Sequence, residues 1–100
     1  MSWSAEQLWP RIEEAAPAAF LEDERRRAIL LKEARSFARL INEEPHRLDD
    51  VYTARYDQEI GRKVLGVSPV TRGKANDVAV AQHSVWRACH AVMSREATAE

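Results

Sequence analysis

The apolar side chains of residues 22–42 recur at helical intervals, and this spacing constrains the fold more than any other feature of the sequence. Steps of four, three and four residues place the strongest of them on one face of a helix. Neighbouring apolar residues widen this face to about half of the circumference, more than a surface helix needs. We therefore predict a central helix from Pro17 or Glu22 to Asn42, contacted from two sides. Its principal buried face comprises Leu30, Ala34, Phe37 and Ile41.

A shorter helix is predicted before it. Ser4 and Gln7 have the spacing of a capping box, in which each side chain accepts a hydrogen bond from the other's backbone N–H. Pro10 lies too deep for a first-turn proline, so we expect a kink or a break there. Pro17 is expected to close this segment and to open the next one.

A third helix is predicted from about Asp50 to Leu65, with Asp49 or Asp50 as its N-cap. Its apolar face is thin, and the residues that form it follow one another at steps of four. Gly66 follows at the place where a glycine in the left-handed conformation commonly ends a helix. The apolar face consists of Tyr52, Tyr56, Ile60 and Val64.

The remaining chain predicts a second start at Ser68-Pro69, with serine as cap and proline as first helical residue. We expect one turn of helix, then a loop with Asn76 or Asp77 as a fresh cap, then a strong helix to about Ser94. Residues 95–100 are predicted to form a frayed tail. The apolar face of the last helix comprises Val78, Ala81, Val85, Ala88, Cys89 and Val92, with Trp86 and Met93 at its edge.

These segments predict an all-α fold, a compact bundle of four to five helices forming a single domain over residues 1–94. Three glycines and four prolines are too few for the many tight turns of a sandwich or barrel. We expect the helix ending at Asn42 to be central and the last helix to pack along it.

Net charge and residue spacing restrict the classes of function that fit the chain. A net charge of −1 produces no global field that would attract nucleic acid or a membrane. The single cysteine, Cys89, and the lack of a recognisable signal sequence predict a cytoplasmic protein. His46, His83, His90 and Cys89 lack the spacing of a metal site, and no residues combine into a nucleophile–base pair or a phosphate loop. We therefore expect a non-enzymatic protein without metal or cofactor.

Residues 60–76 resemble a bacterial helix-turn-helix, because a helix is followed by Gly66-Val67-Ser68 and a new helix from Pro69. The resemblance implies a small transcription regulator, presented to DNA as a dimer. An ordinary corner between two bundle helices is the alternative explanation of the same residues. The DNA-facing residues implied by the resemblance are Val70, Thr71, Arg72 and Lys74.

A protein partner is the favoured expectation, because tyrosine, tryptophan and arginine on two helices are the residues that most often anchor interfaces. The chain resembles small all-helical anti-CRISPR inhibitors encoded by phages, because it is short, nearly neutral, rich in arginine, predicted to be helical and poor in motifs. That resemblance implies steric blocking of a multi-subunit host complex and transfers no functional residue. A homodimer is also left open. The predicted protein-binding residues are Tyr52, Arg55, Tyr56, Arg62, His83, Trp86 and His90.

Overall fold

Helices account for nearly all of the described chain in the computed structural model, which describes residues 2–66 and 68–98, with side chains up to residue 94. The predicted all-α bundle is confirmed, and no strand occurs within these ranges. Val67 of the predicted turn and residues 99–100 of the predicted tail lie outside them. The elements are α1 (Ala5–Ala15), α2 (Ala18–Glu22), α3 (Glu24–Glu43), the 3-10 helix η1 (Pro45–Arg47), α4 (Leu48–Leu65) and α5 (Pro69–Thr98).

The capping box that starts α1 is confirmed. The Ser4 hydroxyl accepts the Gln7 N–H at 3.3 Å, and the Gln7 side chain accepts the Ser4 N–H at 2.9 Å. Of the kink or break expected at Pro10, the break is wrong, because α1 continues through it to Ala15. Pro10 is exposed, so water can satisfy the Glu6 carbonyl that loses its usual N–H partner.

Of the two predicted starts of the helix that ends at Asn42, Glu22 is close to the observed start of α3, whereas a helix from Pro17 is divided in two. Asp23 separates α2 from α3, and its carboxylate accepts the Arg26 N–H at 2.8 Å, which satisfies a free donor of the first turn. Asp77 of α5 is 5% exposed and forms ion pairs with two arginines of α3. It contacts Arg25 at 2.6 Å and Arg26 at 3.5 Å. This ion pair ties the start of α3 to α5.

The expected loop before Asp77 is also wrong, since α5 runs without interruption from Pro69 to Thr98, beyond the predicted end at Ser94. The predicted start is confirmed, because the Ser68 hydroxyl accepts the Thr71 N–H at 3.1 Å. Asp77 is buried in the ion pair with α3 and does not cap a new helix.

The ends of α4 differ from the prediction in two respects. The helix begins at Leu48, directly after η1, so Asp49 and Asp50 lie in its first turn and neither is the N-cap. Their charges there still favour the positive end of the helix dipole. Gly66 has φ −62° and ψ 123°, which is not the left-handed conformation. It provides room instead, because a Cβ atom there would lie 3.0 Å from the Arg62 carbonyl oxygen and 2.8 Å from the Arg72 Cγ.

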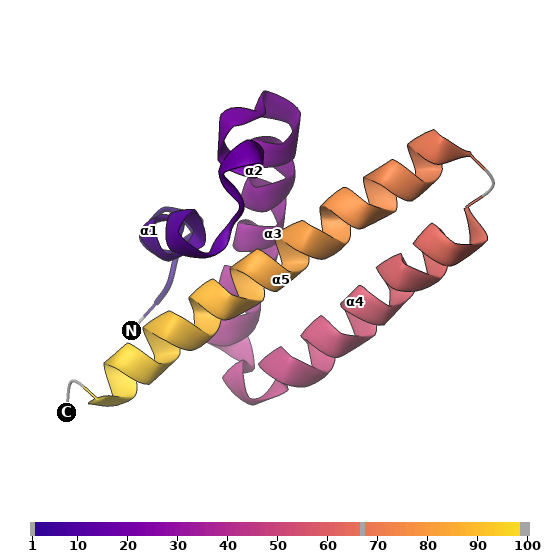
Figure 1. The fold of residues 1–100 in the computed structure, drawn as a ribbon. Helices are drawn as coiled ribbons and strands as arrows, with labels where there is room; N and C mark the ends of the chain where they lie inside the picture. The colour runs from indigo at the N-terminus through magenta and orange to yellow at the C-terminus, as the bar shows by residue number, and fades with distance from the viewer. Residues whose placement is uncertain (1, 67, 99–100) are drawn as a thin grey trace.

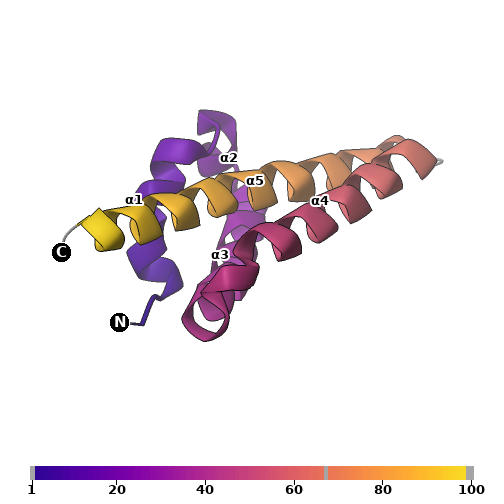
Figure 2. The same cartoon turned by 90° about the horizontal axis from the view of Figure 1, so that it is seen from below.

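The helices form a crossed body and a projecting hairpin (Figure 1). α5 crosses α3 and also contacts α1, while α4 runs antiparallel beside α5 (Figures 1 and 2). The last helix therefore lies across the predicted central helix and not along it. The α4–α5 hairpin extends beyond the body and gives the molecule extents of 50 × 28 × 17 Å. None of the described helices combines the length and apolar character needed to cross a bilayer.

The hydrophobic core lies where α1, α3 and α5 meet. The apolar faces predicted for the helices now labelled α3 and α5 supply most of the core. Every residue of these two faces is buried except Val78, which is half-buried. Leu8 and Ile12 of α1 are completely buried against them. The largest completely or almost completely buried side chains are Phe37, Leu8, Ile12, Leu30, Val85, Cys89 and Ser84.

The hairpin geometry predicts opposite effects for two glycines. Gly73→Ala should stabilise the protein by about 0.5–1 kcal/mol, because Gly73 is helical and a Cβ there meets open space. Gly66→Ala should destabilise it, because its Cβ would crowd the Arg62 carbonyl. Urea unfolding of both variants checks the prediction. A lower midpoint for Gly73→Ala would contradict the helical assignment of this segment.

Candidate functional site

An aromatic cluster joins α4 to α5 where the hairpin leaves the body. The rings of Tyr52 and Trp86 stack with centroids 4.5 Å apart and planes only 10° from parallel. The Tyr52 hydroxyl is hydrogen-bonded to His83 Nδ1 at 3.0 Å. Burial raises the pKa of Tyr52, and Tyr56 and the Asp57 carboxylate add to the shift. The phenol therefore keeps its proton across the physiological range and remains available for this hydrogen bond.

Asp49 holds the outer side of this cluster. One of its oxygens, Oδ1, accepts a hydrogen bond from Trp86 Nε1 at 2.8 Å and contacts His90 Nε2 at 2.6 Å. The hydrogen bonds from Trp86 and His90 lower the pKa of the Asp49 carboxyl. A single carboxylate in the first turn of α4 thus fixes two side chains on α5.

Five of the seven predicted protein-binding residues meet in the aromatic cluster. Arg55 and Arg62 lie elsewhere. Arg55 turns towards α3, where it donates to the Ser36 hydroxyl at 2.9 Å and lies 5.0 Å from the Phe37 ring centroid. Arg62 lies further along the hairpin, 3.6 Å from Glu59. The five that meet are Tyr52, Tyr56, His83, Trp86 and His90.

A polar layer replaces hydrophobic core where α3, α4 and α5 approach one another. Glu59 and Gln82 are 7% and 4% exposed. Burial raises the pKa of Glu33, against the opposing effects of Arg55 and Lys32, and the charge of Glu59 raises it further. Buried charged groups of this kind add little net stability, because desolvation offsets their attraction.

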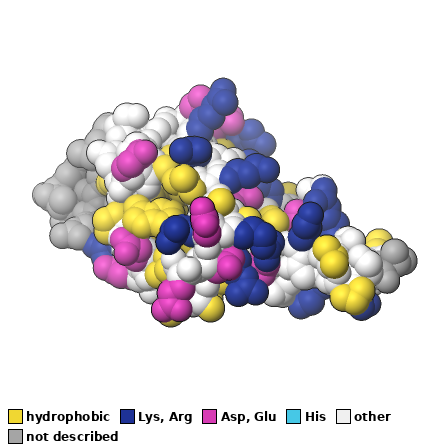
Figure 3. All heavy atoms as spheres, turned by 90° about the horizontal axis from the view of Figure 1, so that it is seen from above, with side chains coloured by type: hydrophobic (Ala, Val, Ile, Leu, Met, Phe, Trp, Pro, Cys, Tyr) yellow, Lys and Arg dark blue, Asp and Glu magenta, His cyan; other side chains and the backbone are white. Residues whose placement is uncertain are grey.

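The far end of the hairpin exposes both apolar and basic side chains. Val64, Leu65 and Val70 are 74%, 80% and 69% exposed on either side of the turn. Residues 60–76 carry four basic residues and no acidic one. Figure 3 shows exposed hydrophobic side chains between Lys and Arg side chains at this end. We call this surface the hairpin tip, and it consists of Arg62, Lys63, Val64, Leu65, Val70, Arg72 and Lys74.

The four residues implied by the helix-turn-helix resemblance occupy the first two turns of α5. Val70, Thr71, Arg72 and Lys74 are all exposed. The Thr71 hydroxyl is hydrogen-bonded to the Ser68 hydroxyl at 2.9 Å. Their helix runs antiparallel to α4, whereas a DNA-binding helix-turn-helix joins its helices at about 90–120°.

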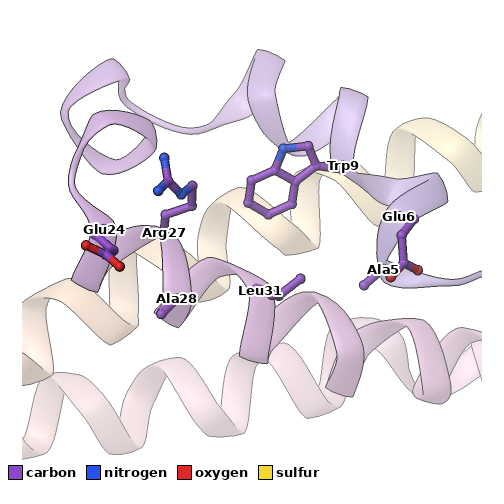
Figure 4. Close-up of a pocket in the computed structure, with 7 residues that line it drawn as sticks. All are labelled: Ala5, Glu6, Trp9, Glu24, Arg27, Ala28 and Leu31. Atoms are coloured by element: carbon purple, nitrogen blue, oxygen red, sulfur yellow. The ribbon is translucent and has the colours of Figure 1, made fainter.

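A groove between α1 and α3 forms a second exposed apolar surface (Figure 4). Trp9 of α1 stands over Ala28 and Leu31 of α3, and the groove encloses about 600 Å³. This groove could not be predicted from the sequence, because nothing in the spacing of α1 shows which part of α3 lies opposite Trp9. We call it the α1–α3 groove, and it is lined by Ala5, Glu6, Trp9, Glu24, Arg27, Ala28 and Leu31.

The chemistry of Cys89 is that of a packing residue. It is completely buried, and burial raises the pKa of its thiol to about 12. The thiolate that nucleophilic attack or metal binding would need is therefore scarce at neutral pH. Within the described residues, no three His, Cys, Asp or Glu side chains lie close enough to hold a metal ion.

No protein-family model matches this chain, and no curated protein and no solved structure shows a significant match to it. The candidate surfaces therefore rest on the geometry of the chain itself. The two that combine exposed apolar area with charge are the hairpin tip and the α1–α3 groove.

The Asp49 contacts predict an acid-dependent loss of stability. Because the folded-state pKa lies below the unfolded value of about 3.8, the stabilisation is complete above that pH and disappears as pH falls through the folded-state pKa. Asp49→Asn should therefore unfold at lower urea than the wild type at pH 7. The difference should shrink below about pH 3.8.

The neighbouring Asp50→Asn serves as control, because Asp50 is an exposed acid in the same first turn. The NMR shift of the Trp86 indole proton should move in the Asp49 variant and stay in place in the control. Equal acid dependence in both variants would show that the Asp49 contacts do not stabilise the fold.

Proposed function

We propose that this protein is a non-catalytic interaction module that binds an acidic, partly apolar surface of a protein partner through its hairpin tip. The observation that carries the proposal is the exposure of Val64, Leu65 and Val70 at the end of a projecting basic hairpin. Exposed apolar side chains bordered by charge are typical of protein interaction sites. The four surrounding cations favour an acidic partner surface and accelerate encounter with it.

The aromatic cluster has a different part in this proposal. Its Trp86 and Tyr52 polar atoms already have partners within the chain, and their rings stack on each other. The cluster therefore suits a structural role, in which it closes the base of the hairpin and orients the tip. Exposed His83 and half-buried Tyr56 remain available as a secondary contact surface.

The proposed setting is the cytoplasm, and the proposed partner is a subunit of a larger host complex. The single buried cysteine suits a reducing compartment. The resemblance to small helical anti-CRISPR inhibitors supports steric blocking as the mode of action. A narrow projecting hairpin suits that mode, because it can enter a recess that the bulk of the molecule then covers.

The experiment is an affinity capture from nuclease-treated bacterial lysate with three forms of the protein. Wild type and a control, Ala54→Ser on the exposed side of α4, should retain the same stoichiometric protein partner. Leu65→Asp should lose it, because the exposed apolar contact becomes a charge of the wrong sign. Retention of the partner by a folded Leu65→Asp variant would exclude the hairpin tip.

Double-stranded DNA is a second candidate ligand, favoured by the four basic residues of the tip. Phosphate contacts would make affinity fall with salt, with a slope of about −0.9 per contact on logarithmic axes. In fluorescence anisotropy with a labelled duplex, Arg72→Ala combined with Lys74→Ala should weaken binding and flatten this slope by about 2. Duplex binding that survives both substitutions would remove the helix-turn-helix hypothesis.

A further inference from the structure

The α1–α3 groove has the shape and apolar character of a docking site for a small protruding surface. Its floor combines the half-buried Trp9 ring with exposed Ala28 and half-buried Leu31. Figure 4 shows Glu24 and Arg27 at one end, and Ala5 with Glu6 at the other. A large aromatic face beside small side chains can accept branched aliphatic groups such as leucine or valine.

The side chains that line the groove carry a small excess of negative charge. Glu6 and Glu24 line it. The single lining cation, Arg27, donates to the Leu21 carbonyl at 3.1 Å, so its guanidinium is partly engaged by its own chain. An occupant with an apolar centre and a basic border therefore fits best.

The hairpin tip of the same protein has this complementary composition. It presents three exposed aliphatic side chains and four cations, and no acid occurs within residues 60–76. The tip and α1 lie far apart on the molecule in both ribbon views (Figures 1 and 2). Because α5 is one continuous helix that contacts both α1 and α4, the tip cannot fold back onto its own groove.

We propose that the α1–α3 groove binds the hairpin tip of a second copy of this chain. The inference rests on the proposed function in one respect, namely that the tip is a docking surface. The contact is head-to-tail, so each added copy leaves one tip and one groove free, and association produces chains or closes into a ring. Self-association covers the tip and competes with any other partner for it.

The test uses sedimentation velocity with a variant on each side of the contact. Wild type should show a mean mass that rises above the 11.4 kDa monomer with concentration and falls back in high salt. Leu65→Asp replaces an apolar contact of the hairpin tip with a negative charge. Ala28→Arg fills the groove and repels the tip without altering the core, because Ala28 is exposed. Each variant alone should stay monomeric.

Mixing the two variants gives the decisive result. Leu65→Asp still has a groove and Ala28→Arg still has a tip, so the mixture should form dimers and nothing larger. Ala54→Arg adds the same charge at an exposed position outside the groove and should associate like wild type. A mixture that remains monomeric would overturn the proposal, as would wild type that stays monomeric at every concentration.

The outcomes separate this inference from the proposed function. If wild type stays monomeric while Leu65→Asp still loses its lysate partner, the groove contact is excluded and the interaction module stands. If the mixed variants form dimers while the lysate yields no partner dependent on Leu65, the tip binds only a second copy.

Discussion

Contact between α5 and three other helices depends on the small side chains along its buried face. Ala81, Ala88 and Cys89 are completely or almost completely buried and leave space for the larger residues of α1 and α3. Interiors are packed so closely that added methylene groups at such positions force neighbouring backbones apart. Phe37 and Leu30 of α3 and Leu8 and Ile12 of α1 fill that space. The crossed arrangement of the body follows from this contrast in side-chain size.

The hairpin is stabilised differently along its length. At its base, the Tyr52–Trp86 stack and the Asp49 carboxylate bind α4 to α5. In its middle, buried Glu59 and Gln82 occupy positions that apolar residues would fill in a core. At its end, Gly66 allows α4 and α5 to come close enough for a short turn. The contacts at its base therefore orient the α4–α5 hairpin, and the apolar residues of the hairpin tip remain exposed for contact with a partner.

Local sequence patterns predicted the helices well because their causes are local. The four-three-four spacing of residues 30–41 identified a helix face that is buried throughout. The Ser4 and Ser68 caps were predictable because a capping hydroxyl and the backbone N–H that donates to it lie three residues apart. His83, Trp86 and His90 lie three and four residues apart, a spacing that places them on one side of a helix, where their rings contact one another.

Contacts between distant segments could not be predicted in the same way. Asn76 or Asp77 was predicted as a helix cap, since the polar neighbours and Gly73 suggest a break, whereas Asp77 forms an ion pair with α3 within an uninterrupted α5. Asp49 or Asp50 was expected to cap α4, and the role of Asp49 in holding Trp86 and His90 depends on the pairing of α4 with α5. The α1–α3 groove was missed for the same reason, because it exists only where two separately predicted helices meet.

The position of α5 in the chain has a consequence for biosynthesis. α1 and α3 are made first, but their buried residues face a helix whose core side chains extend to Val92. Until that segment leaves the ribosome, α1 and α3 have only each other to pack against, so part of the surface around Leu8 and Leu30 stays exposed or is shielded by a chaperone. This bundle can therefore complete its core only after α5 has emerged, because α1 and α5 are far apart in the sequence and in contact in the fold.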